Sequence, residues 1–194
     1  DKAGRLIFIL LASQPEYPEL KADIETRYAA YNPAVLSVPE LTRGQSETVL
    51  ASRELIDSPV PLLIHNADTG YEIGDAWIED IEHHKPDGAL LVFKSRENRW
   101  SFSRTDDRGR VVEVREKDPI SCWASTGTYY FGKGSDFVRL AERRIIGEKV
   151  ESGEFYVAPL YNDLIGEGSH VVNYEIDRLF CFGTPEDLDA TLST

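Results

Sequence analysis

Three short, uninterrupted apolar runs decide which folds this sequence can adopt. They cover residues 6–12, 61–65 and 88–93. Each run has the length of a strand, and a strand without polar alternation is typical of a sheet that is covered on both faces. The segments between the runs have the amphipathic spacing of helices. This rhythm predicts an α/β fold with a mostly parallel central sheet and helices on both faces.

The second half of the sequence departs from the rhythm. Residues 100–105 and 110–114 flank Asp106-Asp107-Arg108-Gly109, a turn-forming tetrapeptide, so we expect an additional small antiparallel hairpin. Without a repeat or linker, residues 1–194 read as a single domain. The other expected elements are helices at 17–31, 46–55, 77–84, 135–146 (N-cap Ser135), 156–165 and from 185 (N-cap Thr184), and strands at 34–38, 128–131, 171–176 and 179–182.

Charge and cysteine content narrow the class of function. The formal net charge of -13 argues against nucleic acid as a partner, because phosphate backbones are held by clustered Lys and Arg. The longest apolar run is too short to span a bilayer, so no membrane partner is expected. Cys122 and Cys181 need no disulfide, which favours a reduced, cytoplasmic setting. The oligomeric state stays open, a homo-oligomer included.

Asp68 is the strongest single candidate for chemistry. It follows the apolar strand at 61–65, and ligands of open α/β sheets gather outside the carboxyl ends of the strands. A carboxylate at that place is a suitable ligand for Mg²⁺ bound to phosphates. An Asx-turn or a helix cap is the common alternative at a strand end.

Three further segments carry weaker signals. Around Gly44 and Gln45, small polar residues open a helix, where backbone amides can bind a base or a phosphate, although many ordinary helices begin in this way. Glu116 and Lys117 follow the expected hairpin and can bind a sugar hydroxyl and a phosphate, whereas most such charged runs are simply solvated. Gly127 permits close approach of a ligand or marks a bulge.

The order of these segments along the chain resembles that of one enzyme family. The Gly44 loop opens a helix, an apolar strand ends in Asn66-Ala67-Asp68, and the strand 109–114 runs into Glu116-Lys117. The strand Thr126-Gly127-Thr128-Tyr129-Tyr130-Phe131 and the closing Phe182-Gly183-Thr184-Pro185 follow. Over residues 5–192 the chain resembles the sugar-phosphate nucleotidyltransferases, or sugar-nucleotide pyrophosphorylases, which include thymidylyl-, guanylyl- and cytidylyltransferases of capsule and cell-wall synthesis.

The resemblance implies both a reaction and residue roles. A phosphate oxygen of a phosphorylated small molecule attacks the α-phosphorus of a nucleoside triphosphate, and pyrophosphate leaves. Asp68 is the implied Mg²⁺ ligand and catalytic residue, with Lys117 as the cation for the acceptor phosphate. The implied nucleotide-binding residues are Gly44, Gln45 and Asn66, and the implied substrate-binding residues are Glu116, Gly127 and Asn162.

Two departures from the family pattern bear on activity. The family begins with a strand, a Gly-rich loop with a basic residue and a Pro-Lys-Pro-like stretch, and this sequence shows no counterpart of them. We therefore expect the printed chain to be a poor catalyst by itself and to leave apolar surface uncovered. At the place of the family's second acidic metal ligand stands Cys181, a poor ligand for Mg²⁺. Asn162, Asp177 or water are the candidates to replace it, and Asn162 is the one we favour.

Two other functions compete with this interpretation. A glycosyltransferase of the related fold normally carries Asp-x-Asp at the strand end, whereas Thr69 and Gly70 follow Asp68. A non-catalytic domain that keeps the fold is favoured by Cys181 and the absent loop. It is disfavoured by the retention of Asp68, Glu116 and Lys117.

Overall fold

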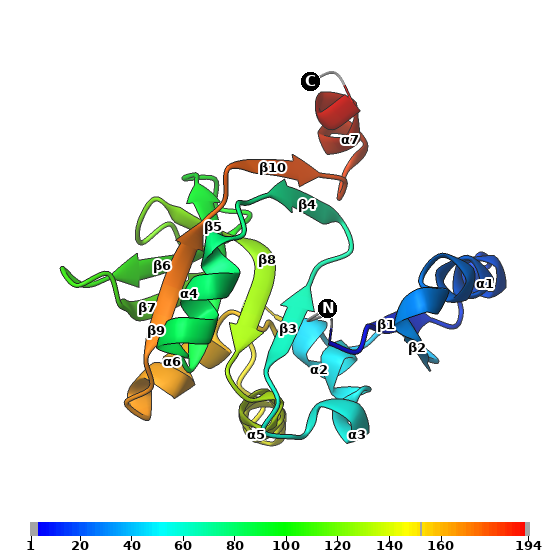
Figure 1. Ribbon diagram of the computed structural model, residues 1–194, viewed down its shortest axis with the longest axis horizontal. Coiled ribbons are helices and arrows are strands. Elements are labelled where there is room, and N and C mark those ends of the chain that lie inside the picture. Colours follow the sequence, from blue (N-terminus) through cyan, green and yellow to red (C-terminus); the bar gives the residue numbers. More distant parts are fainter. Residues whose placement is uncertain (1–3, 152, 193–194) are drawn as a thin grey trace.

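The computed structural model describes residues 4–151 and 153–192. Its centre is a six-stranded sheet in the order β7-β6-β8-β5-β9, with β3 as a further partner of β8 (Figure 1). The hairpin that was predicted around Asp106 is present as β6 and β7. The strands of this sheet are β3 (Leu62–His65), β5 (Gly88–Lys94), β6 (Ser101–Thr105), β7 (Val111–Glu116), β8 (Trp123–Phe131) and β9 (Val171–Glu175).

The sheet is mixed, so the prediction of a mostly parallel sheet is wrong. Of its described strand pairs only β5–β9 is parallel, while β8 runs antiparallel to β3, β5 and β6. The alternation of strands and helices up to residue 93 agrees with the common direction of β3 and β5, which both run antiparallel to β8. It did not show that β8 lies between β3 and β5. A continuous apolar run indicates that both faces of a strand are buried, but it does not indicate the direction of the strand.

Helices cover both faces of the sheet, as predicted. Leu90 and Val92 of β5 belong to the main core with α5 (Gly134–Ile146) and α6 (Leu160–Gly166). Ala89, which points to the opposite face, packs with Ile81 of α4 (Ala76–His84). The strand β5 is therefore apolar throughout because each face meets a helical layer.

Several helix boundaries differ from the prediction. The expected helix 46–55 is divided into α2 (Gln45–Leu50) and α3 (Arg53–Ile56). The helix expected from residue 156 begins only at Leu160, because Pro159 disfavours helical backbone in the residue before it. Ser135 lies inside α5 instead of capping it. Thr184 does cap α7 (Pro185–Leu192), since its Oγ1 accepts a hydrogen bond from the Asp187 N–H at 3.1 Å.

Two small sheets flank the centre. Strand β4 (Thr69–Glu72), which the sequence did not predict, pairs antiparallel with β10 (Arg178–Cys181). Strand β1 (Ile7–Leu11) pairs in parallel with β2 (Ala34–Val38), beside α1 (Tyr17–Arg27) and a 3-10 turn (Ala29–Tyr31).

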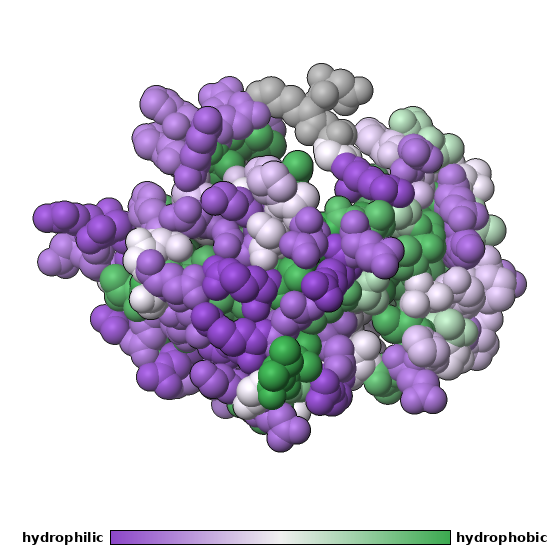
Figure 2. Space-filling view, turned by 90° about the horizontal axis from the view of Figure 1, so that it is seen from below, coloured by the Kyte–Doolittle hydropathy of each residue, from purple (hydrophilic) through white to green (hydrophobic). Residues whose placement is uncertain are grey.

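The strands β1 and β3 each keep one open edge among the described residues, because β1 pairs only with β2 and β3 only with β8. Leu63 of β3 is 47% exposed. Figure 2 shows apolar side chains gathered on the side of the molecule that carries β1 and β2. No helix in the described part of the chain is long and apolar enough to cross a bilayer.

Candidate active site

The site begins at a break in the sheet, where two strands meet end to end along one edge of β8. His65 at the end of β3 lies opposite Thr128, and Phe102 of β6 lies opposite Ala124. The N–H of Asn66 then donates to the Gly127 carbonyl at 3.2 Å. Three residues of β8, 125–127, lie between these two pairing positions, which are therefore roughly 13 Å apart at strand spacing.

This break brings together residues that lie far apart in the sequence. Asp68 follows β3 directly. Glu116 ends β7 opposite Ser101, the first residue of β6, and the N–H of Lys117 donates to the Trp100 carbonyl at 3.0 Å. The structure therefore places Asp68 on one side of the break and the Glu116-Lys117 pair on the other.

Gly127 allows Asn66 to approach the strand closely. Its φ is +80°, and a Cβ added to Gly127 would lie 2.5 Å from Nδ2 of Asn66. The Gln45 amide donates to Oδ1 of Asn66 from the opposite side. Asn66 therefore contacts both Gly127 and Gln45, two further residues of the predicted site.

Residues 42–46, which the resemblance implies bind the nucleotide and which are here called the nucleotide loop, are fixed against residues 155–156. Gly44 has a φ of +143°, and a Cβ at Gly44 would lie 2.5 Å from the backbone N of Phe155. The Ser46 N–H donates to the Phe155 carbonyl at 2.9 Å, and the Ser46 hydroxyl donates to the Tyr156 carbonyl at 2.8 Å. Only glycine at position 44 permits this contact between two backbones.

Glu116 lies in a polar cluster between β6, β7 and β8. Its carboxylate accepts a hydrogen bond from the hydroxyl of Ser101, and burial raises the pKa of Glu116 above its ordinary value. Tyr129 of β8 lies near Ser125 and Ser101, and burial raises the pKa of Tyr129 to about 12. A half-buried carboxylate surrounded by hydroxyl groups is suited to accept hydrogen bonds from a polyol.

Lys117 presents an exposed ammonium group with one close side-chain partner. Its Nζ donates to the hydroxyl of Tyr156 at 2.8 Å, and this hydrogen bond raises the pKa of Lys117. The backbone of Lys117 has a φ of +57°, which is unusual for a residue with a side chain. Because its pKa is raised, the side chain of Lys117 remains cationic at neutral pH.

The sequence interpretation missed Ser101 and Tyr156 as parts of this site. Ser101 and Ser103 alternate with Phe102 in β6, and this pattern was the available sign that the serines share one face. Tyr156 was assigned to a helix, whereas the observed helix α6 begins only at Leu160, after Pro159.

Asp68 adjoins the end of β10. Its carbonyl accepts a hydrogen bond from the Phe182 N–H at 2.8 Å, and a Cβ at Gly183 would lie 3.1 Å from Oδ2 of Asp68. Cys181 is close enough for the charge of Asp68 to act on its thiol, whose pKa is raised first by burial and then by Asp187. The position of the family's second ligand therefore lies beside Asp68 and holds a thiol.

The carboxylate of Asp68 suits a magnesium ion whose remaining ligands are water molecules and substrate phosphates. Among the described residues no group of three His, Cys, Asp or Glu side chains could hold a metal ion. Mg²⁺ characteristically keeps several waters and takes one or two carboxylates together with substrate phosphates. The exposed carboxylate of Asp68 is compatible with that mode of binding and with no tighter one.

The structure does not support Asn162 as a replacement metal ligand. Its Oδ1 accepts from the Val114 N–H at 2.8 Å, and its Nδ2 donates to the Val114 carbonyl at 2.7 Å. Asn162 therefore caps the outer edge of β7, and β6 and β8 lie between it and the strand that precedes Asp68. It lines a depression of about 380 Å³ with Glu113, Arg115, Glu116, Asp118 and Glu151.

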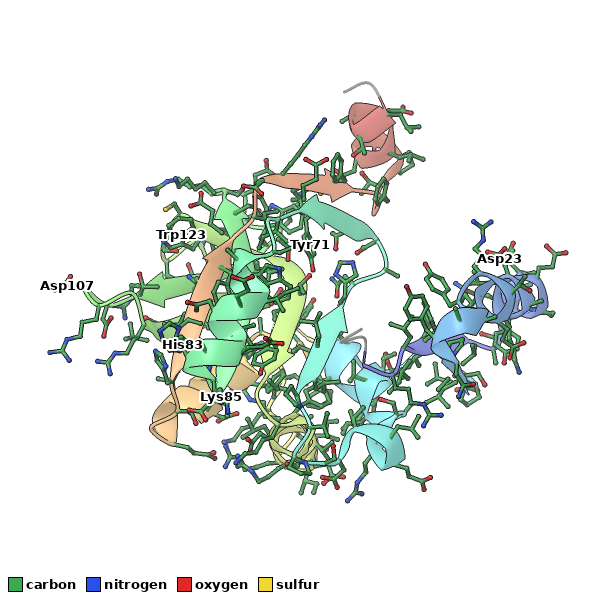
Figure 3. All side chains as sticks on the ribbon, viewed as in Figure 1. Asp23, Tyr71, His83, Lys85, Asp107 and Trp123 are labelled. Atoms are coloured by element: carbon green, nitrogen blue, oxygen red, sulfur yellow. The ribbon has the colours of Figure 1, made fainter. Side chains whose placement is uncertain are left out.

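Both ring nitrogens of His65 have hydrogen-bond partners. Its Nε2 is 2.9 Å from the Thr69 carbonyl, and its Nδ1 is 2.8 Å from the Thr128 hydroxyl. A carbonyl only accepts, so Nε2 carries the proton, and burial by its neighbours lowers the pKa of His65. The ring packs edge-on against Tyr71, which Figure 3 labels on β4. His65 thus fixes β4, directly after Asp68, to β8.

Comparison with solved structures identifies the fold, whereas comparison by sequence finds no matching family model and no matching curated protein. A nucleoside-diphosphate-sugar pyrophosphorylase from Vibrio cholerae RC9 matches with a TM-score of 0.83 and 26% identity, over 99% of this chain and 82% of that one. A Bacillus anthracis protein assigned as a glucose-1-phosphate thymidylyltransferase matches with a TM-score of 0.76 and 14% identity, over 96% and 74% of the two chains.

An inositol-1-phosphate CTP transferase from T. maritima gives a TM-score of 0.72 and 12% identity, over 97% of this chain and 74% of that one. The two matches with lower identity bear on the fold alone. All three have the architecture that the order of motifs implied, and the Vibrio cholerae match covers 99% of the present chain. This chain therefore has the nucleotidyltransferase fold of the sugar-nucleotide pyrophosphorylases.

Proposed function

We propose that the protein joins a nucleoside triphosphate to a sugar phosphate, or to a similar phosphorylated metabolite, with release of pyrophosphate. The observation that carries this proposal is the break beside Gly127, where Asp68 and the Glu116-Lys117 pair meet on the fold of the pyrophosphorylases. Nucleotidyl transfer needs a metal-binding carboxylate and a cation for the acceptor phosphate on two sides of one site.

Each side of the break has a separate task. The nucleotide loop, with Gly44 and Gln45, and the adjoining Asn66 bind the nucleotide. Asp68 would hold Mg²⁺, which neutralises negative charge on the phosphates when it is bound. Lys117 binds the phosphate of the acceptor and orients its attacking oxygen in line with the α-phosphorus. The barrier falls mainly through alignment and charge neutralisation, because the protein has little covalent work to do.

Glu116 recognises the acceptor beyond its phosphate. Ser101 engages its carboxylate, and the lone pairs that remain accept hydrogen bonds from hydroxyl groups of the acceptor. Burial raises the pKa of Glu116 and so disfavours its charged form, and hydrogen bonds from an acceptor rich in hydroxyl groups offset this effect. We place the product among precursors of capsule or cell-surface polysaccharides. This assignment follows from the resemblance of residues 155–162 to a stretch in capsule-associated branches of the family.

Cys181 supports a second candidate, a domain that keeps the fold without the chemistry. A thiol beside Asp68 is a poor partner for Mg²⁺. Glycosyl transfer has less support, because an Asp-x-Asp motif that begins at Asp68 would need its second carboxylate at position 70, where Gly70 stands. A second carboxylate is therefore missing from the segment immediately after Asp68.

A pyrophosphate-release screen of the full-length protein tests the proposal. Common nucleoside triphosphates are crossed with glucose 1-phosphate, inositol 1-phosphate and other phosphorylated metabolites, with and without Mg²⁺. We expect Asp68→Asn to reduce turnover by roughly 100-fold or more while the protein stays folded. The matched control is Asp107→Asn, at the tip of the β6–β7 hairpin in Figure 3, which should retain wild-type turnover. Unchanged turnover in Asp68→Asn would contradict the proposed site.

A further inference from the structure

We propose that Tyr156 is a positioning residue, which holds the ammonium group of Lys117 toward the acceptor phosphate and ties it to the nucleotide loop. The inference rests on the proposed function and deepens it. It names the residue that sets the distance between the two substrates. Tyr156 belongs to no helix or strand, and the family resemblance assigned it no role.

The contact with Lys117 selects one conformation of a flexible side chain. The backbone of Lys117 is fixed by its hydrogen bond to the Trp100 carbonyl, whereas its side chain is exposed. A lysine in that position loses considerable rotamer entropy when it is ordered. The hydrogen bond of 2.8 Å to the Tyr156 hydroxyl provides this order before any substrate binds. It uses one of three ammonium protons and leaves two for a phosphate.

A tyrosine suits this task better than a carboxylate would. The charges of Glu116 and Glu154 act on Lys117, but among the described residues the ammonium makes its hydrogen bond to the neutral hydroxyl. A carboxylate partner would form an ion pair that an incoming phosphate must break. The neutral hydroxyl orients the ammonium group without forming an ion pair with it. The site thus presents an ordered cation to the acceptor.

The nucleotide loop holds Tyr156 from the other side. The Phe155 N–H donates to the Arg43 carbonyl at 3.0 Å, and Ser46 donates to the carbonyls of both Phe155 and Tyr156. Ser46 is 2% exposed, so water competes little for these bonds. A shift of the nucleotide loop therefore shifts Tyr156, and with it the ammonium group of Lys117.

Arg144 of α5 anchors the same segment to the body of the protein. Its guanidinium donates to the Pro159 carbonyl at 2.8 Å and to carboxylate oxygens of Asp163 and Glu151 at 2.6 and 3.0 Å. The Arg144 side chain is only 12% exposed. Tyr156 therefore projects from a segment that is fixed on both sides, as a residue that positions another must be.

The test replaces Tyr156 by Phe in the full-length protein, which removes the hydroxyl and keeps the ring. With the substrate pair that the screen identifies, we expect the KM for the phosphorylated acceptor to rise about 10-fold. This is the effect of losing one hydrogen bond to a charged group. The KM for the nucleotide and kcat should stay within about twofold of wild type. The control Tyr174→Phe removes a hydroxyl that bonds Asp80, away from the site, and should leave all constants unchanged.

A double-mutant cycle separates positioning from a direct or purely structural role. In a Lys117→Ala background, Tyr156→Phe should have no further effect on the acceptor KM, because the group that Tyr156 orients is gone. A persistent effect in that background would overturn the inference. So would an equal rise in the KM for the nucleotide, or wild-type constants in Tyr156→Phe itself.

A second readout needs no turnover. NMR signals of the Lys117 side chain, titrated with inorganic phosphate as the probe, should report weaker phosphate binding by about 10-fold in Tyr156→Phe. Equal binding in the variant and the wild type would contradict the role of Tyr156. Failure of the proposed function appears in the wild type, as absence of pyrophosphate release with every substrate pair. Failure of this inference appears only in the comparison of the variant with the wild type.

Discussion

At the scale of single residues, Gly127 determines whether the two halves of the site can meet. It has a left-handed backbone, and a Cβ at this position would lie 2.5 Å from the Asn66 amide nitrogen. Any side chain at this position therefore meets two separate penalties. One comes from the backbone conformation and the other from the displacement of Asn66.

Gly109 provides a control for the first of these penalties. It has a φ of +78°, close to that of Gly127, but a Cβ there would meet nothing within 4 Å. We expect Gly109→Ala to lower the free energy of unfolding by about 1 kcal/mol and Gly127→Ala to lower it by about 2–4 kcal/mol. Only Gly127→Ala should raise the KM for the nucleotide, since Asn66 and Gln45 move with it. Urea unfolding and steady-state kinetics measure both quantities, and equal losses in the two variants would contradict the role of Asn66.

Some residues of the candidate site could be predicted from local sequence pattern, whereas the contacts of others could not. Asp68 and Glu116 stand at strand ends, and the alternation of apolar and polar residues shows where strands end. The contacts of Tyr156 with Lys117 and of Asn162 with Val114 join positions 39 and 48 residues apart. Local pattern carries no information on such pairs, because tertiary packing alone decides them.

At the scale of elements, Asn162, which was expected in the site, binds instead to the backbone of the edge strand β7. Strand β7 lies at the end of the sheet, where unpaired backbone groups invite association with other chains. The Asn162 amide engages both backbone groups of Val114 there, as a neighbouring strand would. The side chain of Val114 is fully buried in the core. Asn162 therefore secures α6 to the edge of β7.

We expect Asn162→Ala to lower the free energy of unfolding by about 1–3 kcal/mol, because it leaves a backbone N–H and a carbonyl without partners. Asn162→Asp keeps the acceptor for the Val114 N–H and loses the donor to its carbonyl, so an intermediate loss is expected. The Mg²⁺ concentration that gives half-maximal turnover should stay unchanged in both. Chemical denaturation and a metal titration provide the measurements. A large change in the Mg²⁺ requirement would restore Asn162 to the metal site.

Element types were easier to predict from the sequence than their arrangement. The hairpin at Asp106 was predicted correctly, because Asp and Gly specify the turn locally and the Gly109 N–H bonds the Asp106 carbonyl at 3.0 Å. The position of β8 was not predicted. Its nine residues are half-buried or buried throughout, and such a strand shows no alternation that would reveal its neighbours or direction.

At the scale of the whole molecule, two regions differ in how they are held. Strand β5 pairs with β8 and β9, and helices cover both of its faces. Strands β1 and β2 pair only with each other among the described residues and lie with α1 beside the main sheet (Figure 1). An isolated two-stranded sheet is marginally stable in water. The printed chain should therefore open locally in this region long before it unfolds globally.

Amide hydrogen exchange of the chain as printed measures that difference directly. We expect the hydrogen-bonded amides of β5 and β8 to exchange at the rate of global unfolding, and those of β1 and β2 to exchange at least roughly 100-fold faster. Mild denaturant should accelerate exchange in β5 and β8 more than in β1 and β2, because global unfolding exposes more surface than local opening does. Strand β3, with one open edge and one edge on β8, should lie between them. Uniform protection of β1 and β8 would show instead that the two regions unfold as a single cooperative unit.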